Sequence, residues 1–451
     1  MSSRDLTQGS IPGHLTRLGA PMVLAVAALI SVALADAYFL GQLGTDELAA
    51  ISFAFPVLLT VNSIGIGLSA GAASVASRAI GKGDRSNTRR LATDSLLLAA
   101  GFLTAVSTVG WFYSRDLFML LGAEGRVLDL IVEYMKVWFI GVPLFIVPMV
   151  AMGLIRANGD SLAPSLIMVL ASIVNIVLDP LFIYGWGPVP ELGVAGAAWA
   201  TFGSRVVSFV LVVPLLVFRE RLVTFEMPSV TAFVSSSSQV LRVGIPAAGS
   251  NMINPLSISI VTAFLASYGN EAVAAFGVAS RVETLATIPM LALSSAIGPV
   301  AGQNWGRGYK DRTIETITSA FKFVVVCGLL LGALFFFIAE PATAVFTDDP
   351  DVQRWARRYL VIVGVTLGGY GVVINASAAY NAIDKANIGL GFTMIRSLLL
   401  YVPLVGFAVS FGPPIYVLGA IAITNVVAGG SVAFLTLRIL RRERCVAQGT
   451  A

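Results

Sequence analysis

A carboxylic acid, Asp36, lies deep inside a hydrophobic stretch that runs from Arg17 to Gly41. An ionised aspartate at the centre of a membrane helix costs about 2.5 to 3.5 kcal/mol, so Asp36 should face the protein interior and find a proton, a cation or a polar partner. The residue type and its position therefore predict that Asp36 binds and releases a coupling cation.

A second acid, Asp179, lies four residues after Asn175, which places both side chains on one helix face. Pro180 follows directly and has no N–H, so a carbonyl of the preceding turn lacks its helical partner. Thr201 shares a face with Ala197 in the next hydrophobic stretch. Two carboxyl groups, an amide, a hydroxyl and free carbonyl oxygens suit a shared proton or a hard cation such as Na⁺.

The composition around these residues is that of a membrane protein. Hydrophobic residues make up 57% of 451 residues and charged residues only 12%, with a mean hydropathy of +0.85. Charge-poor stretches of about 20 residues or more, long enough for a helix to cross the hydrocarbon, recur twelve times. They lie near 16–41, 47–77, 91–113, 127–155, 162–184, 193–218, 243–268, 272–303, 314–338, 352–382, 388–410 and 415–438. No ten-residue alternating pattern suggests a barrel, so we expect an all-α integral membrane protein with 12 transmembrane helices.

The basic residues are unevenly distributed among the connections between these stretches, and positively charged loops stay in the cytoplasm. If the N-terminus lies inside, the inner connections hold Arg78, Lys82, Arg85, Arg89, Arg90, Arg219, Arg221, Arg307, Lys310, Arg312, Arg438, Arg441, Arg442 and Arg444. The outer connections hold fewer basic residues, mainly Arg115, Arg126, Arg354, Arg357 and Arg358, alongside Asp46, Glu47, Glu191, Glu271, Asp348, Asp349 and Asp351. Both termini are therefore predicted to be cytoplasmic, and the net charge of +4 indicates topology rather than nucleic-acid binding.

The chain has two cysteines, Cys327 and Cys445, and a single histidine, His14. Two isolated cysteines argue against a disulfide framework and a thiolate metal site. A lone histidine removes His-based triads and zinc-peptidase motifs from consideration. We expect no cofactor, and the one metal ion that fits the predicted oxygen ligands is Na⁺ at the coupling site.

The two halves of the chain repeat each other at a constant offset in residue number. Arg17-Leu-Gly-Ala-Pro21 matches Arg242-Val-Gly-Ile-Pro246, and Gly81-Lys-Gly83 matches Gly306-Arg-Gly308 at the same offset. Six spans return the chain to its starting side, so the halves should be parallel repeats related by an axis along the membrane normal. The predicted parts are an N-lobe (1–218), a cytoplasmic linker (219–241), a C-lobe (242–440) and a cytoplasmic tail (441–451).

The repeat shows which candidate residues are not duplicated. Moved by the offset that joins Arg17 to Arg242, Asp36 falls on Val261, and after a small slip the block around Asp179 aligns with a run around Leu399 and Pro403 that has no acid. Thr201 has a counterpart in Thr424. The paired acidity therefore belongs to the first half alone, where we expect the coupling site.

Three further residues are second-tier candidates. Glu283 corresponds to Leu58 in the first half, so it is also unduplicated. It could attract a cationic substrate or have a purely structural role. Arg205, one turn below the threonine of the site, could be a counter-charge to the acids or face a cytoplasmic cavity. Pro21 could be a hinge that lets its helix bend when Asp36 changes protonation.

The motifs taken together resemble one transporter family. The pattern comprises an early proline followed by an acid, two Gly-x-Gly loops, Asn175-x-x-x-Asp179-Pro180 and Gly193-Val-Ala-Gly-Ala-Ala-Trp-Ala-Thr201. It resembles the multidrug and toxic compound extrusion (MATE) family, particularly its prokaryotic DinF-like branch, over nearly the whole chain.

The resemblance implies two pseudo-symmetric six-helix bundles in a V shape, which export drugs or metabolites in exchange for H⁺ or Na⁺. It also implies an N-lobe cation site, whose members here are Asp36, Asn175, Asp179, Thr201 and Ala197 through its carbonyl. Other branches carry an acid-rich cation site in the second lobe. The stretches Asn251–Pro255 and Gly371–Asn375 contain no acid, which favours the first lobe.

Two rival functions remain. A flippase for a lipid or a lipid-linked saccharide, built on a related fold, would favour a cavity lined with several arginines. An intramembrane aspartyl protease is suggested by Gly81-Lys-Gly-Asp84, but this segment lies in a basic connection and its repeat carries Tyr309 instead of the acid. A ring of pore-lining charges, typical of a channel, is not found in the sequence.

We therefore expect a secondary active antiporter and not an enzyme. Its expected substrate is a cationic or amphipathic small molecule, and H⁺ is favoured over Na⁺ because paired acids supply proton affinity directly. The expected setting is the plasma membrane of a bacterium or archaeon, with the protein active as a monomer and without nucleic-acid partners.

Overall fold

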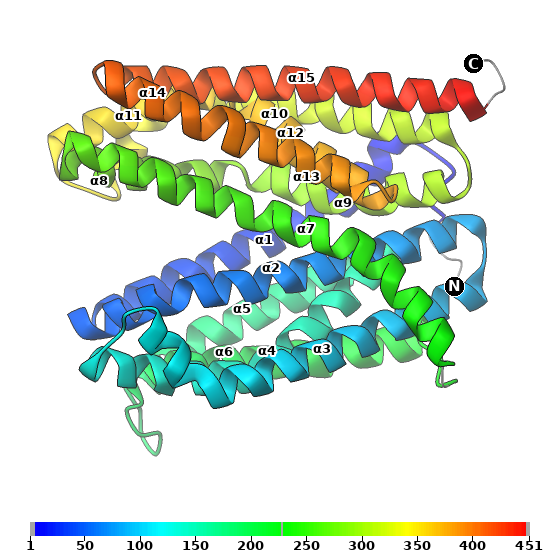
Figure 1. The fold of residues 1–451 in the computed structure, drawn as a ribbon, viewed down its shortest axis with the longest axis horizontal. Helices are drawn as coiled ribbons and strands as arrows, with labels where there is room; N and C mark the ends of the chain where they lie inside the picture. The colour runs from blue at the N-terminus through cyan, green and yellow to red at the C-terminus, as the bar shows by residue number, and fades with distance from the viewer. Residues whose placement is uncertain (1–4, 227–228, 448–451) are drawn as a thin grey trace. The chain divides into compact units, whose positions relative to one another are not determined.

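The structure is a computed structural model that describes residues 5–226 and 229–447. It is all-helical, as the sequence predicts, and β pairing in the described part is limited to an isolated bridge between Trp186 and Val189 (Figure 1). The first half contains α1 (Ile11–Gly41), α2 (Thr45–Lys82), α3 (Arg85–Leu120), α4 (Gly125–Ala157), α5 (Leu162–Ile183), α6 (Gly193–Pro214) and the π-helical turn η1 (Leu215–Arg219).

The second half is divided into more pieces. It contains α7 (Val230–Leu265), the 3₁₀ turn η2 (Ala266–Tyr268), α8 (Asn270–Ala286), α9 (Ile288–Gly306), α10 (Lys310–Ala344), α11 (Pro350–Gly364), α12 (Leu367–Ala382), α13 (Ala386–Met394), the π-helical turn η3 (Ile395–Tyr401), α14 (Val402–Phe411) and α15 (Ile415–Ala447). The elements η3 and α13–α14 together form one span, Ala386–Phe411.

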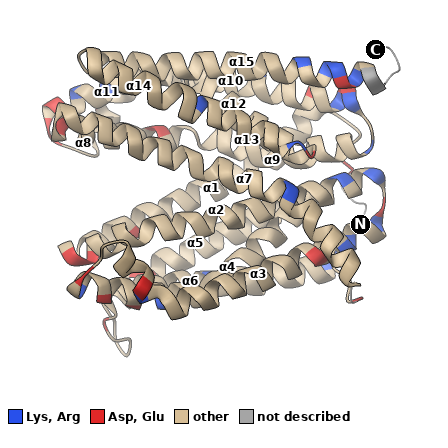
Figure 2. Ribbon diagram, in the orientation of Figure 1, with Lys and Arg blue, Asp and Glu red and all other residues tan. Residues whose placement is uncertain are grey.

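By length and composition, nine helical spans in the described residues can cross a membrane, and eleven if the bent pairs α8–α9 and α11–α12 each count as one span. α7 is a further helix of 36 residues, which carries the polar run Ser235–Ser238. The charged residues gather near the helix ends and leave the middle of most helices apolar (Figure 2). The fold class predicted from the sequence is confirmed.

The eighth and tenth predicted spans are bent rather than continuous. The bend between α8 and α9 is 46°, next to Pro289 in the first turn of α9, and the bend between α11 and α12 is 60°. The second bend has no proline but lies among glycines that pack on α10. A Cβ on Gly328 of α10 would come within 2.2 Å of the backbone nitrogen of Gly368 on α12, so the two helices cross only because both residues lack side chains.

The described chain divides into two compact units, each with its own hydrophobic core. One unit, here called the N-lobe, comprises Leu24–Ile80 and Asp84–Ala248, and the other, the C-lobe, comprises the chain up to Val23, Gly81–Gly83 and the chain from Gly249. The division passes through α1 just after Pro21, the predicted hinge, and through the middle of α7.

The boundaries of the linker and tail differ from those expected. α7 begins at Val230, so about half of the predicted linker 219–241 is helix. α15 continues to Ala447, so the predicted tail 441–451 is helical that far, and residues 448–451 lie outside the described part. The polar run expected in the linker is therefore the first part of a helix.

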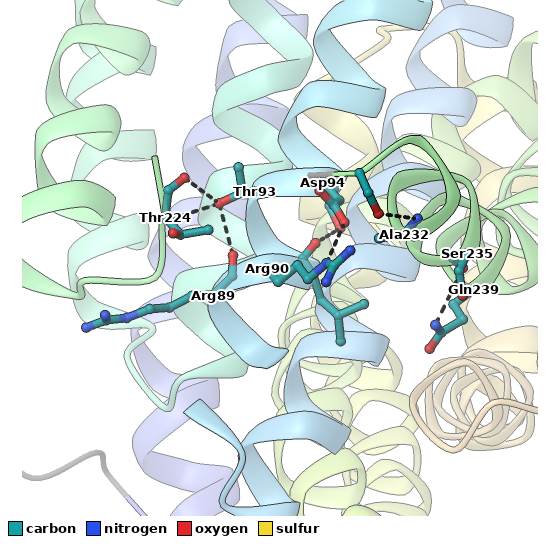
Figure 3. Close-up of polar contacts among 11 residues, drawn as sticks. Arg89, Arg90, Thr93, Asp94, Thr224, Ala232, Ser235 and Gln239 are labelled. Carbon is teal, nitrogen blue, oxygen red and sulfur yellow. Dashed lines mark hydrogen bonds and ion pairs between the residues drawn. The ribbon is translucent and has the colours of Figure 1, made fainter. Parts of the chain in front are cut away.

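The short linker is held against the start of α3. Thr93 receives a hydrogen bond from the backbone N–H of Thr224 and donates one to the carbonyl of Arg89 (Figure 3). The Nε of Arg89 donates a further hydrogen bond to the carbonyl of Arg221. One turn of helix away, Arg90 lies 3.9 Å from the buried carboxylate of Asp94.

The repeated glycine loops are helix connections. Gly83 and Gly308 both have positive φ, 79° and 84°, a conformation that glycine adopts without strain. Asp84 is the N-cap of α3 and accepts a hydrogen bond from the backbone N–H of Asn87. The acid of the Gly-x-Gly-Asp segment therefore has a structural role.

Candidate functional site

The carboxyl groups of Asp36 on α1 and Asp179 on α5 lie close enough to share a hydrogen bond inside the N-lobe. Asp179 is 0% exposed, and neither of its oxygens receives a hydrogen bond from an N–H or hydroxyl donor of the described residues. Two ionised carboxylates repel each other, and a bond between them requires a proton on one of them. The arrangement can therefore hold a proton, or a cation in its place.

Asn175 lies one turn before Asp179 on α5, as its spacing predicts, and is 2% exposed. Among the described residues, neither its amide oxygen nor its amide nitrogen has a hydrogen-bond partner. A buried polar group left unpaired costs about 1 to 3 kcal/mol, so this amide is available to an ion, a water molecule or the neighbouring acid.

Ala197 and Thr201 lie on α6, which packs closely against α5. A Cβ on Gly196 would come within 2.3 Å of the carbonyl oxygen of Phe182, so the start of α6 and the end of α5 touch through their backbones. Ala197 is buried, and Thr201 is partly exposed and lines a pocket of the N-lobe. In the described residues no hydrogen bond joins Thr201 to either acid.

Arg205 lies one turn after Thr201 and lines the same pocket, together with Asn62 on α2 and aromatic residues of α4. Its guanidinium carbon lies 4.1 Å from the ring centroid of Phe145, and its buried Nε has no hydrogen-bond partner in the part of the chain that the structure describes. The positive charge of Arg205 also acts on Asp36. Arg205 therefore lies within electrostatic range of an acid and also lines a pocket, so its position is compatible with both roles considered for it.

Tyr134 on α4 is a member of this cluster that was not selected from the sequence. It is 8% exposed, and its hydroxyl lies within electrostatic range of Asp36, Asp179 and Arg205. The sequence feature that could have identified Tyr134 is the repeat, because the offset between the two halves pairs Tyr134 with another tyrosine, Tyr359. We define the acid cluster as Asp36, Asn175, Asp179, Tyr134 and Arg205.

The C-lobe contains a different polar cluster. The hydroxyl of Tyr359 on α11 donates a hydrogen bond of 2.6 Å to Oε2 of Glu283 on α8, so Glu283 has a structural partner. Arg396, in η3, is a buried basic residue close enough for its charge to act on Glu283. It is not among the residues selected from the sequence, although a charge within an apolar stretch is the same signal that identifies Asp36.

A metal centre built from several acids or histidines is not found in residues 5–226 and 229–447. No group of three or more His, Cys, Asp and Glu side chains there could hold a metal ion. Na⁺ at the acid cluster would instead use the carboxyl oxygens of Asp36 and Asp179 with the amide oxygen of Asn175, all oxygen donors suited to a hard cation.

Comparisons with known proteins agree with one another. A family model described as MatE matches residues 21–181 and 246–405. A relative named FAD transporter, from Shewanella oneidensis, is 36% identical over 425 residues, which is 94% of each chain. The multidrug export protein MepA of Staphylococcus aureus is 26% identical over 77% of this chain and 76% of that protein. The crystal structure of the Vibrio cholerae MATE transporter VcmN in its bent form matches with a TM-score of 0.90 and 27% identity, covering 97% of this chain and 98% of that one.

Proposed function

This chain belongs to the multidrug and toxic compound extrusion (MATE) family, and we propose that its acid cluster couples the export of small molecules to the uptake of a proton. It is a multi-pass membrane transporter and not an enzyme. The observation that carries the proposed coupling is the contact between Asp36 and Asp179, two acids that are left without a donor from the rest of the described chain.

The proton would act by changing the contact between α1 and α5. When a proton bridges Asp36 and Asp179, the two helices are held together by a hydrogen bond between the carboxyl groups. When the proton leaves, the two carboxylates repel, and the charge of Arg205 compensates one of them. Pro21 and Pro180 remove backbone hydrogen bonds from α1 and α5, which lowers the cost of bending either helix.

This change would bias the two access states of an alternating-access cycle. Proton binding at the outer side favours release of the exported compound, and proton loss on the inner side favours loading of the next one. Na⁺ is the second candidate ion because the cluster also offers carboxyl and amide oxygens.

The exported compound is proposed to be cationic or amphipathic. Trp138, Phe145 and Phe202 line the pocket beside Thr201 and offer flat apolar surfaces to such a compound. A flavin nucleotide is a second candidate, because the relative from Shewanella oneidensis that matches 94% of each chain is named as an FAD transporter. The alternative of a lipid flippase receives no comparable support.

The proposed location is a bacterial or archaeal plasma membrane with both termini in the cytoplasm. This orientation follows from the excess of Arg and Lys in the connections that lie on the same side of the membrane as the N-terminus. We propose that a single chain is the working unit, because each lobe has its own core and the acid cluster is built within one lobe.

The test is export by purified protein in proteoliposomes with an imposed ΔpH or ΔpNa. Asp36→Asn and Asp179→Asn should each abolish ΔpH-driven efflux of ethidium and flavins while the protein remains folded. Glu133→Gln changes an exposed acid of α4 in the same lobe and should leave efflux intact. Full ΔpH-driven efflux by either aspartate variant would contradict the proposal, and efflux driven by ΔpNa alone would reassign the ion.

A further inference from the structure

A buried arginine in the C-lobe has no acidic contact among the described residues. Arg396 is 7% exposed and lies in η3, the π-helical turn between α13 and α14. Its Nη2 donates a 3.0 Å hydrogen bond to Oδ1 of Asn425 on α15, and its Nη1 lies 3.4 Å from Oδ1 of Asn254 on α7. Both contacts are to neutral amide oxygens, so neither of them forms an ion pair with the guanidinium.

Glu283, the acid whose charge interacts with Arg396, is hydrogen-bonded to a different residue. Glu283 accepts the 2.6 Å hydrogen bond of Tyr359, and in the described chain no ion pair joins Glu283 to Arg396. The Nε of Arg396 is buried and has no hydrogen-bond partner there. A buried charge that lacks an ion pair carries a desolvation cost of several kcal/mol, which an anionic ligand would offset.

Aromatic rings flank this charge. The guanidinium carbon lies 4.3 Å from the ring centroid of Tyr370 on α12 and 5.6 Å from that of Tyr401. Tyr370 and Asn254 are only partly buried, and the Asn254 amide donates a 3.0 Å hydrogen bond to the Tyr370 hydroxyl. The outer edge of the cluster is therefore both aromatic and polar.

The backbone around Arg396 is irregular, and the side chains are held in place. A π-helical turn is uncommon and often marks a functional site. Asn425 donates to the hydroxyl of Thr366, which lies in the 60° bend between α11 and α12 and donates in turn to the carbonyl of Val363. The amide oxygen that orients Arg396 is thus fixed by the bend itself.

Arg396, like the paired acids of the N-lobe, has no charged counterpart at the matching position of the other repeat. The alignment that places Asn175 opposite Leu399 pairs Arg396 with Ser172, which carries no charge. The charged residues inside each lobe therefore differ between the two repeats.

We propose that Arg396, Asn254, Asn425, Tyr370 and Tyr401 form a binding site for the anionic group of an exported aromatic compound, a phosphate or a carboxylate. The guanidinium offers its unpaired Nε–H and its charge to the anion, and the partly exposed ring of Tyr370 offers a contact to the aromatic part, while the buried Tyr401 supports the guanidinium. This assignment names a substrate class and rests on the export function proposed above.

The test compares two ligands that differ only in the anionic group, riboflavin and riboflavin 5′-phosphate. Their binding to the full-length protein in phosphatidylcholine vesicles is measured by flavin fluorescence, without any ion gradient. Wild-type protein should bind the phosphate ester at least about tenfold more tightly, the effect expected of one charge-assisted contact. Arg396→Gln should bind both flavins equally, whereas Arg438→Gln, which changes an arginine near the end of α15, should keep the preference.

A second variant covers the case in which Arg396→Gln does not fold. Asn425→Asp preserves shape but places a carboxylate beside the guanidinium, and it should also abolish the preference for the phosphate ester. Equal binding of both flavins by the wild type, or a preference that survives either variant, would overturn the site.

An anionic lipid headgroup could present the same chemistry, so phosphatidylglycerol is added in a further arm. Loss of the phosphate preference in wild-type protein on this addition would assign the site to lipid and overturn the substrate assignment. Because binding is measured without a gradient, failure of proton coupling leaves this test unaffected. Likewise, ΔpH-driven ethidium efflux without phosphate preference would contradict this site alone.

Discussion

The hydroxyl of Tyr359 on α11 donates a hydrogen bond of 2.6 Å to Oε2 of Glu283 on α8. Tyr134, the repeat counterpart of Tyr359, lies beside Asp36 and Asp179 in the N-lobe. The tyrosine has kept its place in both repeats while the acid beside it comes from a different helix in each. The duplicated unit therefore preserved a polar position in its interior, and each copy acquired its own charged neighbours.

Tyr134→Phe tests whether the hydroxyl beside the paired acids contributes to transport. The variant keeps the ring but removes a polar group next to both carboxyl groups, so the rate of ΔpH-driven efflux should fall by about tenfold. Efflux from proteoliposomes is the measurement, and Tyr113→Phe, at an exposed position on α3, is the matched control. An unchanged rate in Tyr134→Phe would show that the hydroxyl is only a packing element.

Tyr359→Phe tests the role of the Glu283 contact in the C-lobe. Removing the donor leaves a carboxyl oxygen without its partner and should lower the free energy of unfolding by about 1 to 3 kcal/mol. The midpoint of thermal unfolding in detergent should fall, and that of Tyr416→Phe, at a 56% exposed position of α15, should not. Equal midpoints for wild type and Tyr359→Phe would contradict a stabilising role for this bond.

Gly328→Ala tests the close crossing of α10 and α12. The added methyl group would lie 2.2 Å from the nitrogen of Gly368, so the helices must separate. Overpacking of this kind costs about 1 to 3 kcal/mol, which should appear as a lower unfolding midpoint. Gly298→Ala in α9 is the control, since nothing lies within 4 Å of its added Cβ. Because alanine favours the helix more than glycine does, Gly298→Ala should not lower the midpoint, and a loss as large as that of Gly328→Ala would show that the crossing is not its cause.

Asp84→Ala separates a structural role of the Gly81-Lys-Gly-Asp84 segment from a catalytic one. Loss of the N-cap should destabilise α3 by about 1 kcal/mol and leave the efflux rate of the folded protein unchanged. Asp84→Asn retains a capping side chain and should behave like wild type in both measurements. Complete loss of efflux in folded Asp84→Ala would require a further role for this carboxyl group.

The fold class and the membrane character of this protein follow from its amino-acid sequence alone. Apolar stretches of about 20 residues must become helices in lipid because no other open structure satisfies the backbone there. A constant offset between matching segments, such as Arg17–Pro21 and Arg242–Pro246, shows the duplication. The cost of a charge in hydrocarbon likewise marks Asp36 as exceptional from its position in the chain.

The neighbours of each charged side chain depend on how the helices pack. Three contacts join residues from helices that are far apart along the chain: Asp36 with Asp179, Tyr134 with these acids, and Arg396 with Asn254. Hydrophobic patterning reports which segments cross the membrane but not the rotation of each helix about its axis. The same limit applies to the bend at α11–α12, because it lies where small residues let α10 approach, and that approach exists only in the packed lobe. The bend at α8–α9 differs, since it lies next to Pro289, which the sequence already shows.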